Sequence, residues 1–180
     1  MIRRPPISTL FPYTTLFRSW SCISLAFAFA SALIYGMNIE FALIIGGVVL
    51  LIAGFFDIVD GQVARVSQKI TKTGGFLDSV FDKIAEVAIF LGILVGGFAE
   101  PYLVFLAITF SLLVSYTRSK AESLGIKLQG IGIGERAERL LVIAIIGIIG
   151  FMEYAVIIVI IIACITFIQR IIVTVKALNQ

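Results

Sequence analysis

The sequence predicts an all-α integral membrane protein with six transmembrane helices. Of its 180 residues, 60% are hydrophobic and only 14% are charged, and the mean hydropathy is +1.11. Such a composition excludes a soluble globular domain and is typical of a helical membrane protein. The apolar residues also fall into runs about as long as a membrane-spanning helix, separated by short polar or glycine-containing turns.

The first three predicted helices include the two that flank an aspartate-rich polar stretch. The first, residues 21–37, is barely long enough to span a hydrocarbon core of roughly 30 Å at about 1.5 Å per residue. The second covers residues 39–65 and the third covers residues 75–98. Because the second ends and the third begins with a run rich in aspartate, we expect these acids to lie near one surface of the membrane.

The last three segments complete the predicted bundle. The fourth, residues 101–124, begins at Pro101, and proline is favoured in the first turn of a helix. The fifth, residues 135–151, follows a loop punctuated by glycines, and the sixth covers residues 154–177.

Lysine and arginine are distributed asymmetrically over the ends of these helices. The turns around residues 38–40, 100–101 and 152–153 contain neither. The opposite ends contain Arg65, Lys69, Lys72, Lys83, Arg118, Lys120, Lys127, Arg136, Arg139, Arg170 and Lys176. By the positive-inside rule this basic side is cytoplasmic, with both termini inside. We therefore expect a multi-pass protein of the cell membrane whose aspartate-rich site faces the cytoplasm.

Four aspartates form the most informative feature of the chain. Asp57 and Asp60 are three residues apart, and Asp78 and Asp82 are four apart, so each pair shares one face of its helix. Two acidic faces on adjacent helices predict a convergent set of carboxylates, the ligands that Mg²⁺ prefers. Ion pairs with neighbouring lysines and arginines are the structural alternative. We disfavour it, because four buried acids repel one another without a cation and intramembrane charges usually mark function.

The stretch from Asp57 to Asp82 resembles the signature of the CDP-alcohol phosphotransferase family, Asp-x2-Asp-Gly-x2-Ala-Arg-x8-Gly-x3-Asp-x3-Asp. Its fixed positions are met by Asp57, Asp60, Gly61, Ala64, Arg65, Gly74, Asp78 and Asp82. The resemblance implies a phospholipid-synthesising enzyme in residues 20–180. Such an enzyme transfers a phosphatidyl or archaetidyl group from a CDP-linked lipid to the hydroxyl of a small polar acceptor and releases CMP.

The resemblance also implies roles for individual residues. Two Mg²⁺ ions, for which Mn²⁺ could substitute, would be held by Asp57, Asp60, Asp78 and Asp82. Asp82 would also be the catalytic base that accepts the proton of the attacking hydroxyl. The family positions that line the CDP-lipid pocket correspond to Gly61, Ala64, Arg65 and Thr71.

Two basic motifs follow the acids. Arg118 and Lys120 lie near the end of the fourth helix, and Arg136 and Arg139 lie at the start of the fifth. From the residues alone, these cations could bind a phosphate or could be topology signals that contact acidic lipid head groups. The pair of motifs looks like the family branch that uses inositol phosphate, so we expect all four to bind the acceptor phosphate. Phosphatidylglycerophosphate synthase, whose acceptor is also phosphorylated, is the alternative within the family.

Other classes of function fit the sequence less well. A cation transporter, the alternative from a different class, would place its acids near the middle of the bilayer on several helices. The chain contains no histidine, and its two cysteines lie in separate apolar runs, so a zinc site or a Cys–His pair is excluded. Glycines within the helices permit close helix contacts, and the resemblance implies a homodimer in contact with membrane lipids.

Residues 1–19 depart from this pattern. They contain prolines and scattered threonines without an apolar period, and they resemble the translation of a sequencing adaptor. We expect a non-native or disordered leader without a stable helix, and a genuine interfacial arm is the alternative. Arg3, Arg4 and Arg18 account for the whole formal net charge of +3. The basic balance therefore does not indicate a nucleic-acid partner.

Overall fold

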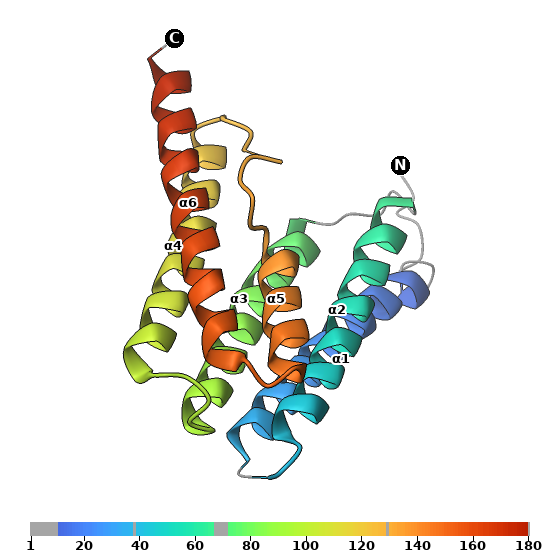
Figure 1. Ribbon diagram of the computed structural model, residues 1–180. Coiled ribbons are helices and arrows are strands. Elements are labelled where there is room, and N and C mark those ends of the chain that lie inside the picture. The colour runs from blue at the N-terminus through green and yellow to red at the C-terminus, as the bar shows by residue number, and fades with distance from the viewer. Residues whose placement is uncertain (1–10, 38, 67–71, 129, 180) are drawn as a thin grey trace.

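The computed structural model describes residues 11–37, 39–66, 72–128 and 130–179. The described residues form six helices and no strand, which confirms the predicted all-α fold (Figure 1). The helices are α1 (Phe11–Gly36), α2 (Ala42–Val66), α3 (Lys72–Val95), α4 (Pro101–Ser123), α5 (Arg136–Ile148) and α6 (Met152–Leu178).

Several helices have the length and composition of membrane spans. Among the described residues, Ala42–Val59, Pro101–Ser123 and Met152–Leu178 are long and apolar enough to cross a bilayer. Cys22–Gly36 is a shorter apolar helix. Large apolar side chains such as Val95 also remain exposed on the outside of the bundle. This arrangement suits a hydrocarbon solvent, because a helix satisfies its own backbone groups there.

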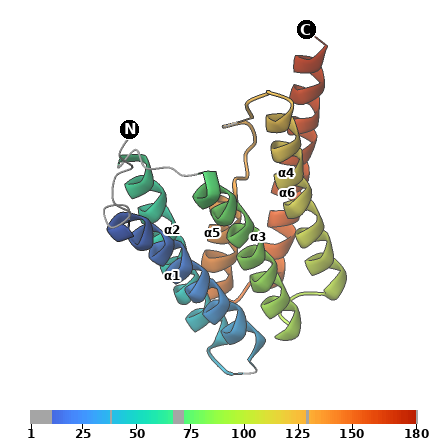
Figure 2. The same cartoon turned by 180° about the vertical axis from the view of Figure 1, so that it is seen from behind.

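The helices form two groups, which are connected by α5 and by packing of α3 against α4. α1 packs against α2 and α3, α4 packs against α6, and α5 packs against α2 and α6. Figures 1 and 2 show α5 lying between the two groups, with the polypeptide that enters it descending along α6. The first residue of α5 therefore lies where both groups can reach it.

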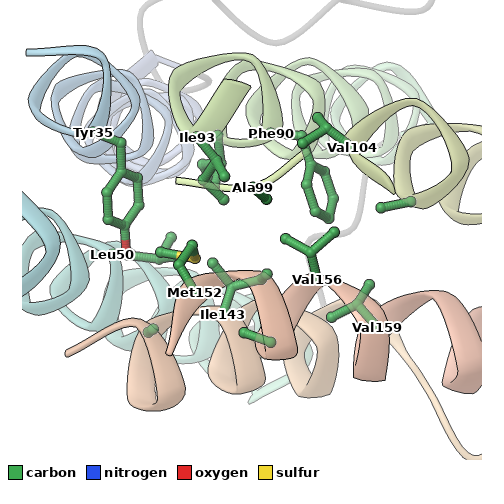
Figure 3. Close-up of a cluster of buried hydrophobic side chains, with 14 of the residues drawn as sticks. Tyr35, Leu50, Phe90, Ile93, Ala99, Val104, Ile143, Met152, Val156 and Val159 are labelled. Carbon is green, nitrogen blue, oxygen red and sulfur yellow. The ribbon is translucent and has the colours of Figure 1, made fainter. Parts of the chain in front are cut away.

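Close helix packing depends on Gly92 of α3 and on Gly96, which follows the last residue of α3. A Cβ atom on Gly92 would lie 2.2 Å from the carbonyl oxygen of Ala32, and one on Gly96 would lie 2.0 Å from that of Tyr35. Only glycine therefore lets α1 and α3 approach this closely. Figure 3 shows the adjoining core, where Tyr35 and Ile93 lie on the opposite side from Met152.

One helix boundary lies ten residues from its predicted position, and several others differ by up to three residues. α1 begins at Phe11 rather than at residue 21, so residues 11–19 are helical where we expected no stable helix. Nothing after Pro12 in this segment breaks a helix, and proline is tolerated in a first turn. α5 ends at Ile148 rather than at residue 151, since Gly150 has a φ of +95° that ends a helix. The prediction of a non-native leader stays a prediction.

Candidate active site

Three of the predicted aspartates converge between α2 and α3. One carboxylate oxygen from each of Asp57, Asp78 and Asp82 can be chosen so that all three lie within 4.8 Å of one another. Ser24 and Leu25 of α1 line the same small pocket. The two acidic helix faces therefore meet, as their spacing predicts.

The position of Asp57 is fixed by the packing of α2 against α1. Ser24 Oγ donates a hydrogen bond to the carbonyl oxygen of Ala53, 3.0 Å away and one helical turn before Asp57. This bond joins α1 to α2, and α3 also packs against α1. On α3, Asp78 and Asp82 are one turn apart and point toward the same pocket.

Arg136 reaches into this cluster from α5. Its Nη1 lies 3.3 and 3.2 Å from the two carboxylate oxygens of Asp57, and it also donates to Oδ1 of Asp82. Arg136 is the first residue of α5, which is capped by a reciprocal pair of bonds between Glu135 and Glu138. The guanidinium offsets part of the repulsion between the clustered carboxylates.

The donor set fits a hard divalent cation. The pocket offers carboxylate oxygens from Asp57, Asp78 and Asp82 and contains neither histidine nor cysteine. Magnesium and manganese prefer such all-oxygen sites, usually completed by water and phosphate. The described aspartates could therefore hold such an ion against a phosphate-bearing substrate.

The remaining signature residues lie at the end of α2 or after it. The backbone of Asp60, Gly61, Ala64 and Arg65 belongs to the last turns of α2, and their side chains lie outside the described part of the chain. Thr71 also lies outside the described residues. Their predicted metal and CDP-lipid contacts stay predictions.

The four predicted acceptor-binding cations have different surroundings. Arg136 contacts the acid cluster, whereas Arg118 pairs with Glu122 on the surface of α4, with 2.9 Å between Nε and Oε1. Lys120 is exposed in the last turn of α4. Arg139 is only 1% exposed and is bonded within the protein. Arg136 is therefore the one of the four that the described contacts place against the aspartates.

Glu86, the partner of Arg139, was not among the predicted site residues. Nε and Nη2 of Arg139 donate to Oε1 of Glu86 over 3.0 and 2.8 Å, and both side chains are 2% exposed. Glu86 could have been predicted from its spacing, because it follows Asp82 by four residues and therefore shares its helix face. A lone acid in the apolar part of a membrane helix marks function by default.

Arg170 is a second residue whose contacts the sequence did not predict. From α6 its Nη1 donates to the carbonyl oxygen of Val114 over 2.8 Å, and its Nε donates to that of Ile131 over 3.0 Å. It therefore joins α6 to α4 and to the loop before α5. Backbone carbonyls carry no sequence signal, so this contact could not have been inferred.

The family model of the CDP-alcohol phosphatidyltransferases matches residues 13–174 of this chain. The chain belongs to this family. The family predicted from the Asp57–Asp82 signature is therefore confirmed. This CDP-alcohol phosphatidyltransferase is a membrane enzyme of phospholipid biosynthesis.

Two named relatives of the transferase come from archaea. Archaetidylinositol phosphate synthase of Pyrococcus horikoshii is 39% identical over 136 residues, which are 76% of this chain and 72% of that protein. The protein of the same name from Methanothermobacter thermautotrophicus is 46% identical over 102 residues, or 57% of this chain and 52% of the relative.

Solved structures share the fold of the transferase. Mycobacterium tuberculosis phosphatidylinositol phosphate synthase with CDP-DAG bound superposes with a TM-score of 0.75 at 23% identity. The match covers 87% of this chain and 84% of the other. The same mycobacterial enzyme in complex with manganese and citrate gives a TM-score of 0.74 at 24% identity.

Proposed function

We propose that this transferase moves a phosphatidyl or archaetidyl group from a CDP-linked lipid to inositol phosphate and releases CMP. Two relatives named archaetidylinositol phosphate synthase support the acceptor. The observation that carries the proposal is the guanidinium of Arg136 within the aspartate cluster. A cation beside the predicted base is suited to an acceptor that carries a negative charge.

The reaction needs a base for the acceptor. In the proposed step, the hydroxyl oxygen of the acceptor bonds to the lipid-side phosphorus. The bond from that phosphorus to the bridging oxygen breaks, and CMP leaves with the electron pair. Asp82, which lies in the pocket with Asp57 and Asp78, takes the hydroxyl proton.

The aspartates have a second role in the proposal. Asp57, Asp60, Asp78 and Asp82 would hold two Mg²⁺ ions, or Mn²⁺ in their place, which would neutralise the diphosphate and stabilise the leaving CMP. The oxygen-only donor set of the described aspartates supports this assignment. Gly61, Ala64, Arg65 and Thr71 would line the CDP-lipid pocket beside them.

Arg136 has a free donor for the acceptor phosphate. Its Nε is buried and has no hydrogen-bond acceptor among the described residues. A buried donor without a partner is costly, so a phosphate oxygen at this position would satisfy it. Arginine also binds phosphate in a two-bonded arrangement that lysine cannot match. The start of α5 adds the favourable end of a helix dipole.

The other predicted cations would assist from two directions. Arg118 and Lys120 would approach the phosphate from the end of α4, where they are partly or fully exposed. Arg139 would assist indirectly, through its position next to Arg136, because its guanidinium is already hydrogen-bonded to Glu86 and Gly134. We further propose a homodimer whose sites face the cytoplasm, on the grounds of helix glycines and the positive-inside rule.

An acceptor screen tests the proposal. Purified transferase, CDP-linked lipid and Mg²⁺ are mixed with inositol phosphate, free inositol or glycerol phosphate, and CMP release is measured. We expect inositol phosphate to give the highest kcat/KM, by about tenfold or more, because free inositol lacks the charge that Arg136 binds. A higher kcat/KM for glycerol phosphate or for free inositol would refute the proposed acceptor. Asp57→Asn provides the background without transfer.

A further inference from the structure

A buried ion pair lies one helical turn deeper than the aspartate cluster. Glu86 and Arg139 are each 1% exposed, and two hydrogen bonds of 3.0 and 2.8 Å join them. Burying both charges is expensive, and such pairs often add nothing to stability compared with apolar residues of similar size. The second oxygen of Glu86, Oε2, also accepts no hydrogen bond from the described residues. Stability alone therefore does not account for this pair.

The same guanidinium fixes the loop that enters α5. Arg139 Nη1 donates to the carbonyl oxygen of Gly134 over 2.7 Å. The loop is pressed against α6 at this point, since a Cβ atom on Gly134 would lie 2.1 Å from Cγ2 of Ile162. Arg139 thus fixes the backbone at Gly134, two residues before Arg136. Arg139 is in turn bonded to Glu86 of α3.

The ion pair is the second of two parallel connections between α3 and α5. Asp82 and Glu86 are one turn apart on α3, and Arg136 and Arg139 are one turn apart on α5. Each acid pairs with one arginine. The main packing partners of α5 are α2 and α6, so these two ion pairs are the described side-chain bonds that join α5 to α3.

We propose that Glu86 and Arg139 are positioning residues for the transfer reaction. Their ion pair fixes the position of α5 along the axis of α3. It thereby holds Arg136 where this residue meets both Asp57 and the acceptor phosphate. Neither residue touches substrate. The inference rests on the proposed role of Arg136 in acceptor binding.

A double-mutant cycle between Glu86→Gln and Arg136→Lys tests this inference. Glutamine keeps the volume of Glu86 and removes its charge. If Glu86 acts through Arg136, Glu86→Gln raises the acceptor KM about tenfold in the parent protein but less than about twofold in the Arg136→Lys background, because coupled residues are not additive. The KM for CDP-lipid changes less than about twofold in both.

Val156→Ala is the matched control for a purely structural effect. Val156 is fully buried in α6 and belongs to the apolar core. We expect this variant to lower the Tm without changing the acceptor KM. An equal rise in acceptor KM for Val156→Ala, or an equal effect of Glu86→Gln in both backgrounds, would overturn the proposal.

A second variant covers the case in which Glu86→Gln does not fold. Arg139→Lys keeps the positive charge but removes the forked guanidinium that bonds to Glu86 and Gly134. It is taken through the same cycle with the same expectations. Failure of both variants to fold would assign the pair to stability and overturn the inference. The cycle uses whichever phosphorylated acceptor is turned over. A wrong acceptor in the proposed function would therefore appear separately, in the screen.

Discussion

Arg136 on α5 and Asp57 on α2 are 79 positions apart in the sequence, yet Nη1 of the arginine lies 3.2 and 3.3 Å from the two carboxylate oxygens of the aspartate. The same nitrogen also bonds to Asp82 on α3. One side chain therefore joins three helices at the aspartate cluster. It places an acceptor-binding candidate against the predicted base.

Arg136→Gln should weaken acceptor binding selectively. Loss of a charge-assisted contact costs roughly 1.5–3 kcal/mol, or about ten- to a hundredfold in affinity. We expect the loss to appear mainly in the acceptor KM in steady-state assays. Arg118→Gln is the matched control, because Arg118 is more exposed and already paired with Glu122, and it should have a smaller effect. Equal losses toward acceptor and CDP-lipid for Arg136→Gln would instead assign Arg136 to the whole site.

Asp82→Asn should separate catalysis from binding. Asparagine keeps the size of the side chain and removes its basicity, so single turnover should slow by ~10²–10⁴ while CDP-lipid still binds with Mg²⁺. Asp57→Asn should lose both binding and turnover, since Asp57 is a proposed metal ligand. Donor affinity and single-turnover rate are measured for both variants. A normal rate for Asp82→Asn would show that another group accepts the proton.

Chelation should stop the reaction. We expect EDTA to abolish CMP release, and Mg²⁺ or Mn²⁺ to restore it, whereas Ca²⁺ restores little because it prefers more ligands at longer distances. Binding to the folded state should also raise the Tm of the wild-type protein when Mg²⁺ is added, and it should not do so for Asp57→Asn. Full activity in EDTA would contradict the proposed metal site.

Gly92→Ala should destabilise the bundle. The added methyl group would meet the carbonyl oxygen of Ala32 at 2.2 Å, and moving a helix backbone typically costs ~1–3 kcal/mol. Gly54→Ala is the control, because a Cβ atom there has no neighbour within 4 Å and alanine favours a helix by about 1 kcal/mol. In thermal unfolding measured in detergent, only Gly92→Ala should therefore have a lower Tm than the wild-type protein. An unchanged Tm would show that α1 and α3 can separate without loss.

The features that local spacing determines were predictable from the sequence. Asp57 is the first residue of a signature whose spacing places acids on helix faces, and Asp78 and Asp82 repeat that pattern on the next helix. Helical periodicity thus predicted that the two faces would meet. The family signature then supplied the chemistry, which no periodicity contains.

The features that depend on contacts between distant helices were not predictable. Arg136 and Arg139 belong to one motif, and the sequence gives no sign that one reaches the aspartates while the other is buried against Glu86. The difference arises because successive arginines three residues apart lie at different depths along α3. Helix α1 also begins earlier than hydropathy indicates, since backbone helix formation does not require an apolar segment.

The loop between α4 and α5 is held at two points by buried arginines. Arg170 binds the carbonyl oxygen of Ile131, and Arg139 binds that of Gly134. Ordering this loop therefore belongs to folding, so acceptor binding need not supply the conformational entropy of closing it. The acceptor should accordingly meet a preorganised site, with an association rate that depends on electrostatic attraction and ionic strength rather than on loop closure.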